Sequence, residues 1–135
     1  MKIYIAAKYE RRHELLESLD APLRKMGHET TSRWLHGETG DKVFWAQADA
    51  DDVLAADAII LVSQHDHPLK GGGGRHFEFG LAYGAQKRLI LIGEREIIFH
   101  HLPGVEVHDT IPEFLSFFAV EDALFSSPHD TEARD

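Results

Sequence analysis

A glutamate, Glu78, follows a run of four glycines, and this spacing is the strongest chemical signal in the chain. The glycines occupy positions 71–74 of the segment GGGGRHFEFG. They connect an apolar, strand-like run, Ala58 to Ser63, to a helix-like segment that starts at about Arg75. Glycines let a ligand approach the backbone, and the unpaired N–H groups of a helix N-terminus attract anions and hydroxyls. We predict that Glu78 lies in the helix's first turn, at the mouth of such a cradle; the alternative is an ordinary surface loop.

A second acid, Asp49, shares a helical face with apolar residues. In the helix-like segment 43–56, Trp45 lies four residues before Asp49 and Val53 four residues after it. A carboxylate on an apolar face is costly unless it is used or paired; the alternatives are a hydrated edge position or an arginine partner. Two carboxylates that flank one cleft can cleave a glycosidic bond, because one attacks or stabilises the anomeric carbon and the other protonates the leaving group.

These acids must be positioned by strands that alternate with helices. Apolar, β-prone runs predict strands at 2–6, 28–32, 58–62, 89–92 and 105–108. Helical spacing predicts helices at about 10–26, 43–56, 75–86 and 111–120. The alternation predicts an α/β fold, a single flavodoxin- or Rossmann-like domain whose doubly wound parallel sheet has about five strands in the order 2-1-3-4-5. Ligands bind such sheets at the carboxyl ends of the strands, here between the first and third, where the glycine run falls.

The chain resembles the nucleoside 2-deoxyribosyltransferases and the related 2′-deoxynucleoside 5′-phosphate N-hydrolases. The resemblance covers roughly residues 2–93. It rests on Tyr4 in the opening strand KIYIA and on the pattern at 49–57, where an acid precedes an Ala-Asp pair that opens the third strand. Its most specific part is Gly74 followed by the sequence EFGLA at 78–82.

This resemblance implies cleavage of the N-glycosidic bond of (deoxy)nucleosides or their 5′-monophosphates. Glu78 matches the nucleophile that forms a covalent glycosyl-enzyme, Asp49 the acid that handles the leaving base, and Tyr4 the hydroxyl that orients the nucleophile. The implied reaction needs neither a metal ion nor an organic cofactor. Family members also complete their sites across subunits.

Two departures leave base exchange and hydrolysis as alternatives. Transferases of this family often carry an acid where this chain has Gly72, and an asparagine near the carboxyl terminus, whereas this chain contains no asparagine. The hydrolases surround the 5′-phosphate with Ser and Arg, whereas the loop after the first strand here, AKYER, offers cations but no serine. We predict base exchange first and hydrolysis of 5′-monophosphates as the alternative.

Further residues are predicted to bind the nucleoside or nucleotide. A guanidinium suits a phosphate and an indole suits the face of a base, although a solvent-directed arginine and a core tryptophan are equally compatible with the pattern. The predicted substrate-binding residues are Ala6, Lys8, Arg33, Trp34, Ser63, Gly72, Gly74, Arg75 and His76.

Composition restricts the remaining function classes. The 135 residues suffice for one domain, which we place at 1–125 with a disordered tail at 126–135. The net charge of -9 argues against binding of a nucleic acid polymer, and the absence of cysteine excludes disulfides and thiolate chemistry. No apolar run is long enough to span a membrane and no secretory signal is evident, so we expect a cytoplasmic protein. The apolar run with Phe114, Phe118 and Phe125 predicts a homo-oligomer.

Other interpretations are weaker. His65 and His67 flank Asp66, but their spacing is not that of a metal site, and we predict none. Asp57 precedes the third strand, where we expect it to bind the backbone. A non-catalytic nucleotide-binding or sensing module remains an alternative function. A flavodoxin-like redox domain is disfavoured, because the loop after the first strand is poor in Gly, Ser and Thr.

Overall fold

A five-stranded parallel sheet is the centre of the computed structural model, which describes residues 1–63 and 73–126. The strands are β1 (Lys2–Ala6), β2 (Glu29–Thr30), β3 (Ala58–Val62), β4 (Arg88–Ile92) and β5 (Glu106–His108). Their order is β2-β1-β3-β4-β5 and every neighbouring pair is parallel, which confirms the predicted fold class and strand order. In the central pair, Tyr4 of β1 is in register with Ile59 of β3.

The central strands have the bounds that their composition predicts. Every residue of β3 is buried, as are the four residues that follow Lys2 in β1. Each strand of a parallel sheet that is covered on both faces is a continuous run of apolar residues, so these strands are easily recognised in the sequence. The strand predicted at 28–32 is shorter in the structure, because beyond Thr30 the hydroxyl of Ser32 accepts the N–H of Ile5 in place of a backbone carbonyl.

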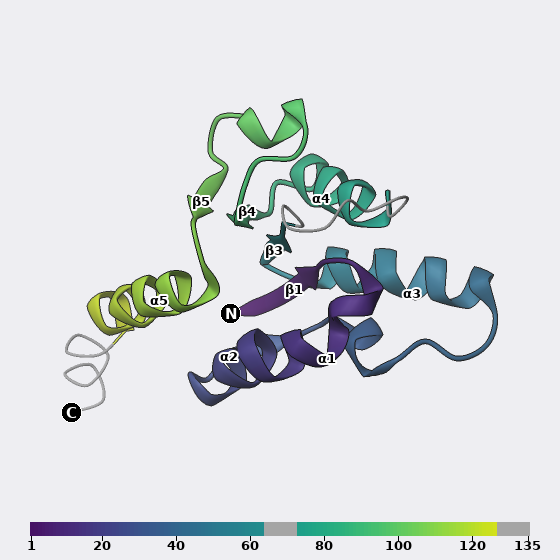
Figure 1. The fold of residues 1–135 in the computed structure, drawn as a ribbon, viewed down its shortest axis with the longest axis horizontal. Helices are drawn as coiled ribbons and strands as arrows, with labels where there is room; N and C mark the ends of the chain where they lie inside the picture. The colour runs from purple at the N-terminus through teal and green to yellow at the C-terminus, as the bar shows by residue number, and fades with distance from the viewer. Residues whose placement is uncertain (64–72, 127–135) are drawn as a thin grey trace.

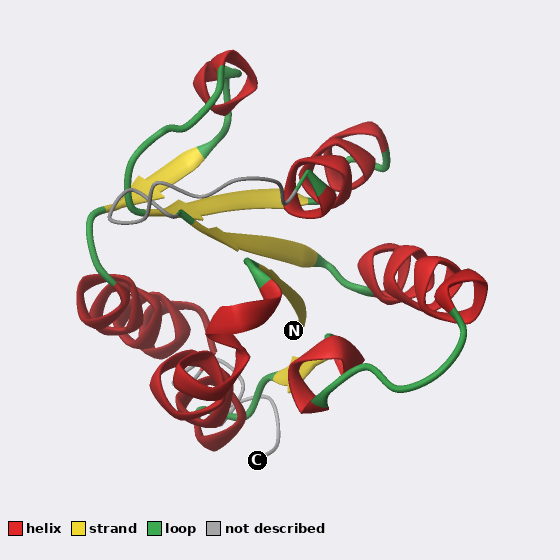
Figure 2. Cartoon of the chain, turned by 45° about the vertical axis from the view of Figure 1, so that its right-hand side comes forward, coloured by secondary structure: helices red, strands yellow, loops and turns green. Residues whose placement is uncertain are grey.

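Helices cover both faces of the sheet (Figures 1 and 2). One layer holds α3 (Lys42–Ala55) and α4 (Gly74–Gly84), which pack against each other. The other layer holds α5 (Ile111–Ser126) and a continuous helical stretch after β1. That stretch consists of the 3-10 turn η1 (Tyr9–Arg11), α1 (Arg12–Leu15), the π-type turn η2 (Leu16–Asp20) and α2 (Ala21–Lys25).

Two short helical turns lie where the sequence predicts loops. They are η3 (Arg33–His36) and η4 (Ile98–His101). In η3, the side chains of Trp34 and Leu35 are buried. Their burial holds this segment against the core of the protein. Helix α5 is also longer than the predicted 111–120 and reaches Ser126, the first residue of the predicted tail.

The apolar carboxyl-terminal run is divided between core and surface. Phe114 and Phe118 of α5 are fully buried, whereas Phe117 and Phe125 are exposed. The homo-oligomer remains a prediction, and the rest of the predicted tail, 127–135, lies outside the described residues. No helix within 1–63 or 73–126 is long and apolar enough to cross a membrane.

Asp57 ties the start of β1 to the start of β3. Its Oδ2 accepts a 2.9 Å hydrogen bond from the backbone N–H of Lys2, and its own N–H donates to the carbonyl of Lys2 at 2.7 Å. The predicted structural role of Asp57 is therefore confirmed. The two contacts fix the relative register of the strands whose carboxyl ends border the functional site.

Candidate active site

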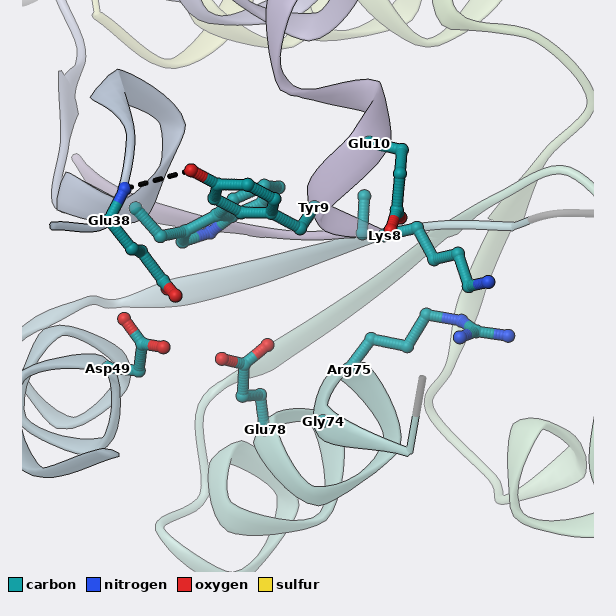
Figure 3. A pocket seen from close by; sticks show the side chains of 10 residues that line it. Lys8, Tyr9, Glu10, Glu38, Asp49, Gly74, Arg75 and Glu78 are labelled. Carbon is teal, nitrogen blue, oxygen red and sulfur yellow. Dashed lines mark hydrogen bonds between the residues drawn. The ribbon is translucent and has the colours of Figure 1, made fainter. Parts of the chain in front are cut away.

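A pocket of about 280 Å³ opens where the loop after β1 approaches the first turns of α4. This is the end of the sheet at which the strand order predicts a ligand. The loop after β1, the segment around η3, helix α3 and helix α4 all contribute side chains (Figure 3). The lining residues are Ala7, Lys8, Tyr9, Glu10, Trp34, Glu38, Asp49, Gly74, Arg75 and Glu78.

Glu78 reaches the pocket from the second turn of α4, not from the first turn as predicted, because the helix begins one residue earlier, at Gly74. Its Oε2 accepts a 2.5 Å hydrogen bond from the hydroxyl of Tyr4. Tyr4 is fully buried in the central strand β1, so its phenol has a fixed direction. The bond therefore fixes Oε2 of Glu78 and leaves Oε1 for a ligand in the pocket.

Burial governs the ionisation of this pair. It raises the pKa of Glu78 to about 8, assisted by the negative charges of Asp49 and Glu38 and opposed by the hydrogen bond from Tyr4. Burial and the neighbouring carboxylates also raise the pKa of Tyr4 far above its ordinary value. Tyr4 therefore stays a neutral phenol and a hydrogen-bond donor, and Glu78 becomes a carboxylate as the pH rises through about 8.

The Tyr4 hydroxyl is expected to support any reaction that needs Glu78 as a carboxylate. In Tyr4→Phe, the loss of a hydrogen bond to a charged group, worth about 1.5–3 kcal/mol, should lower kcat/KM roughly 10- to 150-fold. Because this bond lowers the pKa of Glu78, its removal should also displace the pH profile of kcat/KM to higher pH. Exposed Tyr83→Phe is the matched control, and an unmoved profile in Tyr4→Phe would contradict the assignment.

Asp49 and Glu38 form the other half of the acidic wall. Asp49 projects from α3, and its carboxyl group points towards that of Glu38 and lies across the pocket from Glu78 (Figure 3). Its Oδ1 is buried and has no hydrogen-bond partner within the described residues. Burial raises the pKa of Asp49, and the nearby carboxyl group of Glu38 raises the pKa further. Asp49 is thus suited to hold a proton near neutral pH.

Arg33 is bound to a different acid of α3 and does not line the pocket. Its Nε donates to Oδ1 and Oδ2 of Asp52 at 3.0 Å, and its terminal nitrogen lies 3.0 Å from Oδ1. Asp52 is buried, with 7% of its surface exposed, and no pattern in the sequence marks it as the partner of Arg33. The two residues are 19 positions apart, so only the return of the chain through η3 brings them together. Substrate binding by Arg33 remains a prediction.

Trp34 lines the pocket and is firmly held. Its Nε1–H donates a 2.8 Å hydrogen bond to the carbonyl of Ile5, and 4% of its surface is exposed. The ring of Tyr9 lies near it, with 6.3 Å between the ring centroids. Trp34 is therefore a core residue whose rim reaches the pocket, and its contact with a base remains a prediction.

Lys8 and Arg75 place two cationic side chains at one end of the pocket, which we name the cationic end and which Glu10 also lines. Both side chains lie on the side of the pocket opposite to Asp49 and Glu38, with Glu78 between the two ends (Figure 3). The guanidinium of Arg75 is largely buried and donates to both oxygens of Glu96, at 2.7 and 3.3 Å. Gly74 lies beside Arg75, at the N-terminus of α4. This end can receive an anionic group of a ligand.

Other predicted substrate-binding residues lie outside the lining of the pocket. Ala6 is buried in β1, and the carbonyl of Ser63 accepts a 2.7 Å hydrogen bond from Arg11. His76 packs beside His100, with ring centroids 5.4 Å apart. Gly72 lies outside the described residues.

Gly71 and Gly72, the first half of the glycine run, and the histidine pair at 65 and 67 also lie outside the described residues. Within 1–63 and 73–126, no three His, Cys, Asp or Glu residues are arranged to hold a metal ion. Burial lowers the pKa of His100 to about 4, and the charge of His76 contributes in the same direction, so His100 is neutral at ordinary pH.

Four lining residues are not among the predicted catalytic or substrate-binding residues, although three of them belong to the loop 7–10 that the strand order predicts at the site. Ala7, Tyr9 and Glu10 follow directly after β1, where the fold itself predicts a ligand, so their position in the loop was an available signal. Glu38 lies between η3 and α3, and no periodicity marks it. Its role in the pocket could be recognised only from the path of the chain.

Comparison with known proteins supports the fold. No family model and no curated protein matches the chain. A solved CMP N-glycosidase from Clostridium botulinum is similar, with a TM-score of 0.66 and 20% identity over 89% of this chain and 99% of that one. A 2-deoxyribosyltransferase from Bacillus psychrosaccharolyticus has a TM-score of 0.63 and 18% identity over 85% of this chain and 90% of its own. The chain thus has the fold of these two enzymes.

Proposed function

We propose that this protein cleaves the N-glycosidic bond of nucleosides or their 5′-monophosphates, with Glu78 as the nucleophile. The observation that carries the proposal is the hydrogen bond from Tyr4 to Glu78 in a pocket whose opposite wall holds Asp49. The fold shared with a CMP N-glycosidase and a 2-deoxyribosyltransferase supports it. Both reactions begin with the loss of a base from C1′ of a sugar.

In the first step, the carboxylate of Glu78 attacks C1′. A C1′–O ester bond forms, the C1′–N bond breaks, and its electron pair leaves with the base. Asp49 donates a proton to the departing base, directly or through water, and becomes a carboxylate. Tyr4 keeps its proton and holds Oε2 of Glu78 throughout. The first step therefore needs Glu78 ionised and Asp49 protonated.

In the second step, an acceptor removes the sugar from Glu78. Asp49, now a carboxylate, takes the proton of the attacking water or base, and the ester bond breaks, which returns both carboxyl groups to their starting state. Water gives hydrolysis, and a second base gives exchange. Two inversions at C1′ produce net retention in either case.

Base exchange is the first candidate outcome, and hydrolysis of 5′-monophosphates is the second. The cationic end of the pocket, formed by Lys8 and Arg75, favours a substrate that carries a phosphate. With the phosphate at that end, C1′ lies at Glu78 and the base lies towards Asp49 and Trp34. A CMP N-glycosidase among the similar structures supports a substrate that carries a phosphate.

Removal of the Lys8 charge should discriminate between nucleotides and nucleosides. In Lys8→Ala, the loss of a charge-assisted hydrogen bond of about 1.5–3 kcal/mol should lower kcat/KM for a 5′-monophosphate by roughly 10- to 150-fold. The value for the matching nucleoside should change little. The measurement is the ratio of the two kcat/KM values, with exposed Lys25→Ala as the control. Equal losses on both substrates would contradict a phosphate contact.

The direct test is chromatography of the protein incubated with nucleosides and 5′-monophosphates, each with and without an added acceptor base. New nucleoside formed only with the acceptor identifies a transferase. Free base formed without the acceptor identifies a hydrolase. Ligand binding with no product on any substrate would contradict an enzyme and favour the non-catalytic nucleotide-binding module.

A further inference from the structure

Glu38 is held in the pocket by its own backbone and by its neighbour. The hydroxyl of Tyr9 accepts a 3.0 Å hydrogen bond from the N–H of Glu38, drawn as a dashed line in Figure 3. The next residue, Thr39, accepts a 2.8 Å hydrogen bond at its carbonyl from the indole N–H of Trp45. The segment between η3 and α3 is therefore fixed on both sides of Glu38, although the residue itself is exposed.

Two glycines determine how this segment turns. Gly37 and Gly40 both have a φ of +102°, a conformation that other residues rarely adopt. They flank Glu38 and Thr39, so the turn and its two hydrogen bonds direct the carboxyl group of Glu38 towards Asp49 (Figure 3). The approach of the two acids is thus built into the loop.

The groups around Asp49 are mostly acids, so they do not compensate the negative charges of Asp49 and Glu38. Glu38 faces Asp49 from the loop, Glu78 from α4, and Asp52 lies within α3. The nearby cation, Arg33, forms its ion pair with Asp52. The neutral phenol of Tyr4 is bonded to Glu78. Two carboxyl groups that face each other in partly buried surroundings are most stable when one of them keeps a proton.

We propose that Glu38 is a positioning residue that shares a proton with Asp49 and so keeps Asp49 in the acid form until a departing base takes that proton. The nearby charge of Glu38 raises the pKa of Asp49 beyond the effect of burial. In the reaction, the proton passes from Asp49 to the base and is replaced by the proton of the acceptor that attacks C1′. The catalytic consequence rests on the proposed function, whereas the shared proton is a property of the resting protein.

The test is a pH titration of the Asp49 carboxyl carbon by NMR, in protein that contains aspartate labelled with 13C at that carbon. Asp49→Asn identifies the signal. In Glu38→Gln, the midpoint of the Asp49 titration should fall by about one pH unit. Tyr9→Phe, which releases the backbone of Glu38, should lower the midpoint by a smaller amount. Exposed Glu17→Gln is the matched control and should leave it in place.

A second readout follows the same proton in turnover. A lower pKa of Asp49 leaves fewer molecules in which Asp49 is protonated while Glu78 is ionised, so the maximum of the pH profile of kcat/KM should fall in Glu38→Gln and stay in place in Glu17→Gln. An Asp49 midpoint equal in Glu38→Gln and Glu17→Gln overturns the proposal, as does a shifted midpoint with an unchanged maximum of kcat/KM. If the protein is inactive on every substrate and the Asp49 midpoint still falls in Glu38→Gln, the proposed function is overturned. The proton shared by Glu38 and Asp49 is then still supported.

Discussion

Glu78→Gln is expected to lower turnover by at least about a thousandfold, because an amide cannot form the ester to C1′. The hydroxyl of Tyr4 can still donate to the amide oxygen, so the pocket should keep its shape. Steady-state rates, measured by chromatography of the released base, test the loss of turnover. Calorimetric titration with a nucleoside 5′-monophosphate tests the binding, which should stay within about threefold of the starting protein.

The controls separate lost chemistry from lost structure. Exposed Glu17→Gln makes the same chemical change on the surface and should keep full activity. In Glu78→Ala, a small added anion such as azide can occupy the space of the carboxylate, and we expect it to restore part of the base release and to yield a glycosyl azide. Turnover of Glu78→Gln within about tenfold of the starting protein would exclude a covalent role for this residue.

Asp49→Asn is expected to show the second largest loss. General acid catalysis contributes about 10²- to 10⁴-fold, and an amide cannot supply the proton that a departing base needs. The loss should therefore depend on the leaving group: large for the natural bases and small for a synthetic 4-nitrophenyl glycoside, whose phenolate leaves without a proton. The comparison of kcat/KM on the two kinds of substrate measures this dependence.

The pH profile gives an independent check on Asp49. Because the proposed first step needs Asp49 protonated, kcat/KM of the starting protein should fall on the alkaline side of its optimum, where the pair of Asp49 and Glu78 loses its last proton. In Asp49→Asn this alkaline limb should disappear, while the acid limb that reports Glu78 remains. Asp51→Asn removes an exposed charge two residues away on the same helix and should keep both limbs. An equal loss on both leaving groups would contradict an acid role.

The sequence predicts the sheet well, because each central strand is a short, fully apolar run. The bounds of β1 and β3 agree with the prediction to the residue, and the strand order follows from the alternation with helices. The contact between Tyr4 and Glu78 was implied by the family resemblance, and Asp49 was singled out by the apolar helix face that it shares and by the same resemblance.

The missing parts of the site depend on non-local pairing. In the sequence, Asp52 does not differ from the solvated acids of α3. Its ion pair with Arg33 forms only because the chain at η3 folds back against α3. Glu38 lies in an aperiodic segment whose path is set by two glycines with positive φ and by contacts to Tyr9 and Trp45. Neither pairing leaves a periodic or spacing signal in the sequence, so residue patterns alone could not assign them.

The hydrogen bond between Tyr4 and Glu78 joins the middle of a buried strand to a helix on one face of the sheet. Successive residues of a strand point to opposite faces, so a slip of β1 by one residue would turn the phenol away from Glu78 and bring an aliphatic side chain to its place. The contacts of Asp57 with Lys2 oppose such a slip. During refolding, regained activity would therefore count the molecules whose β1 has paired in its native alignment, as distinct from those that have merely become compact.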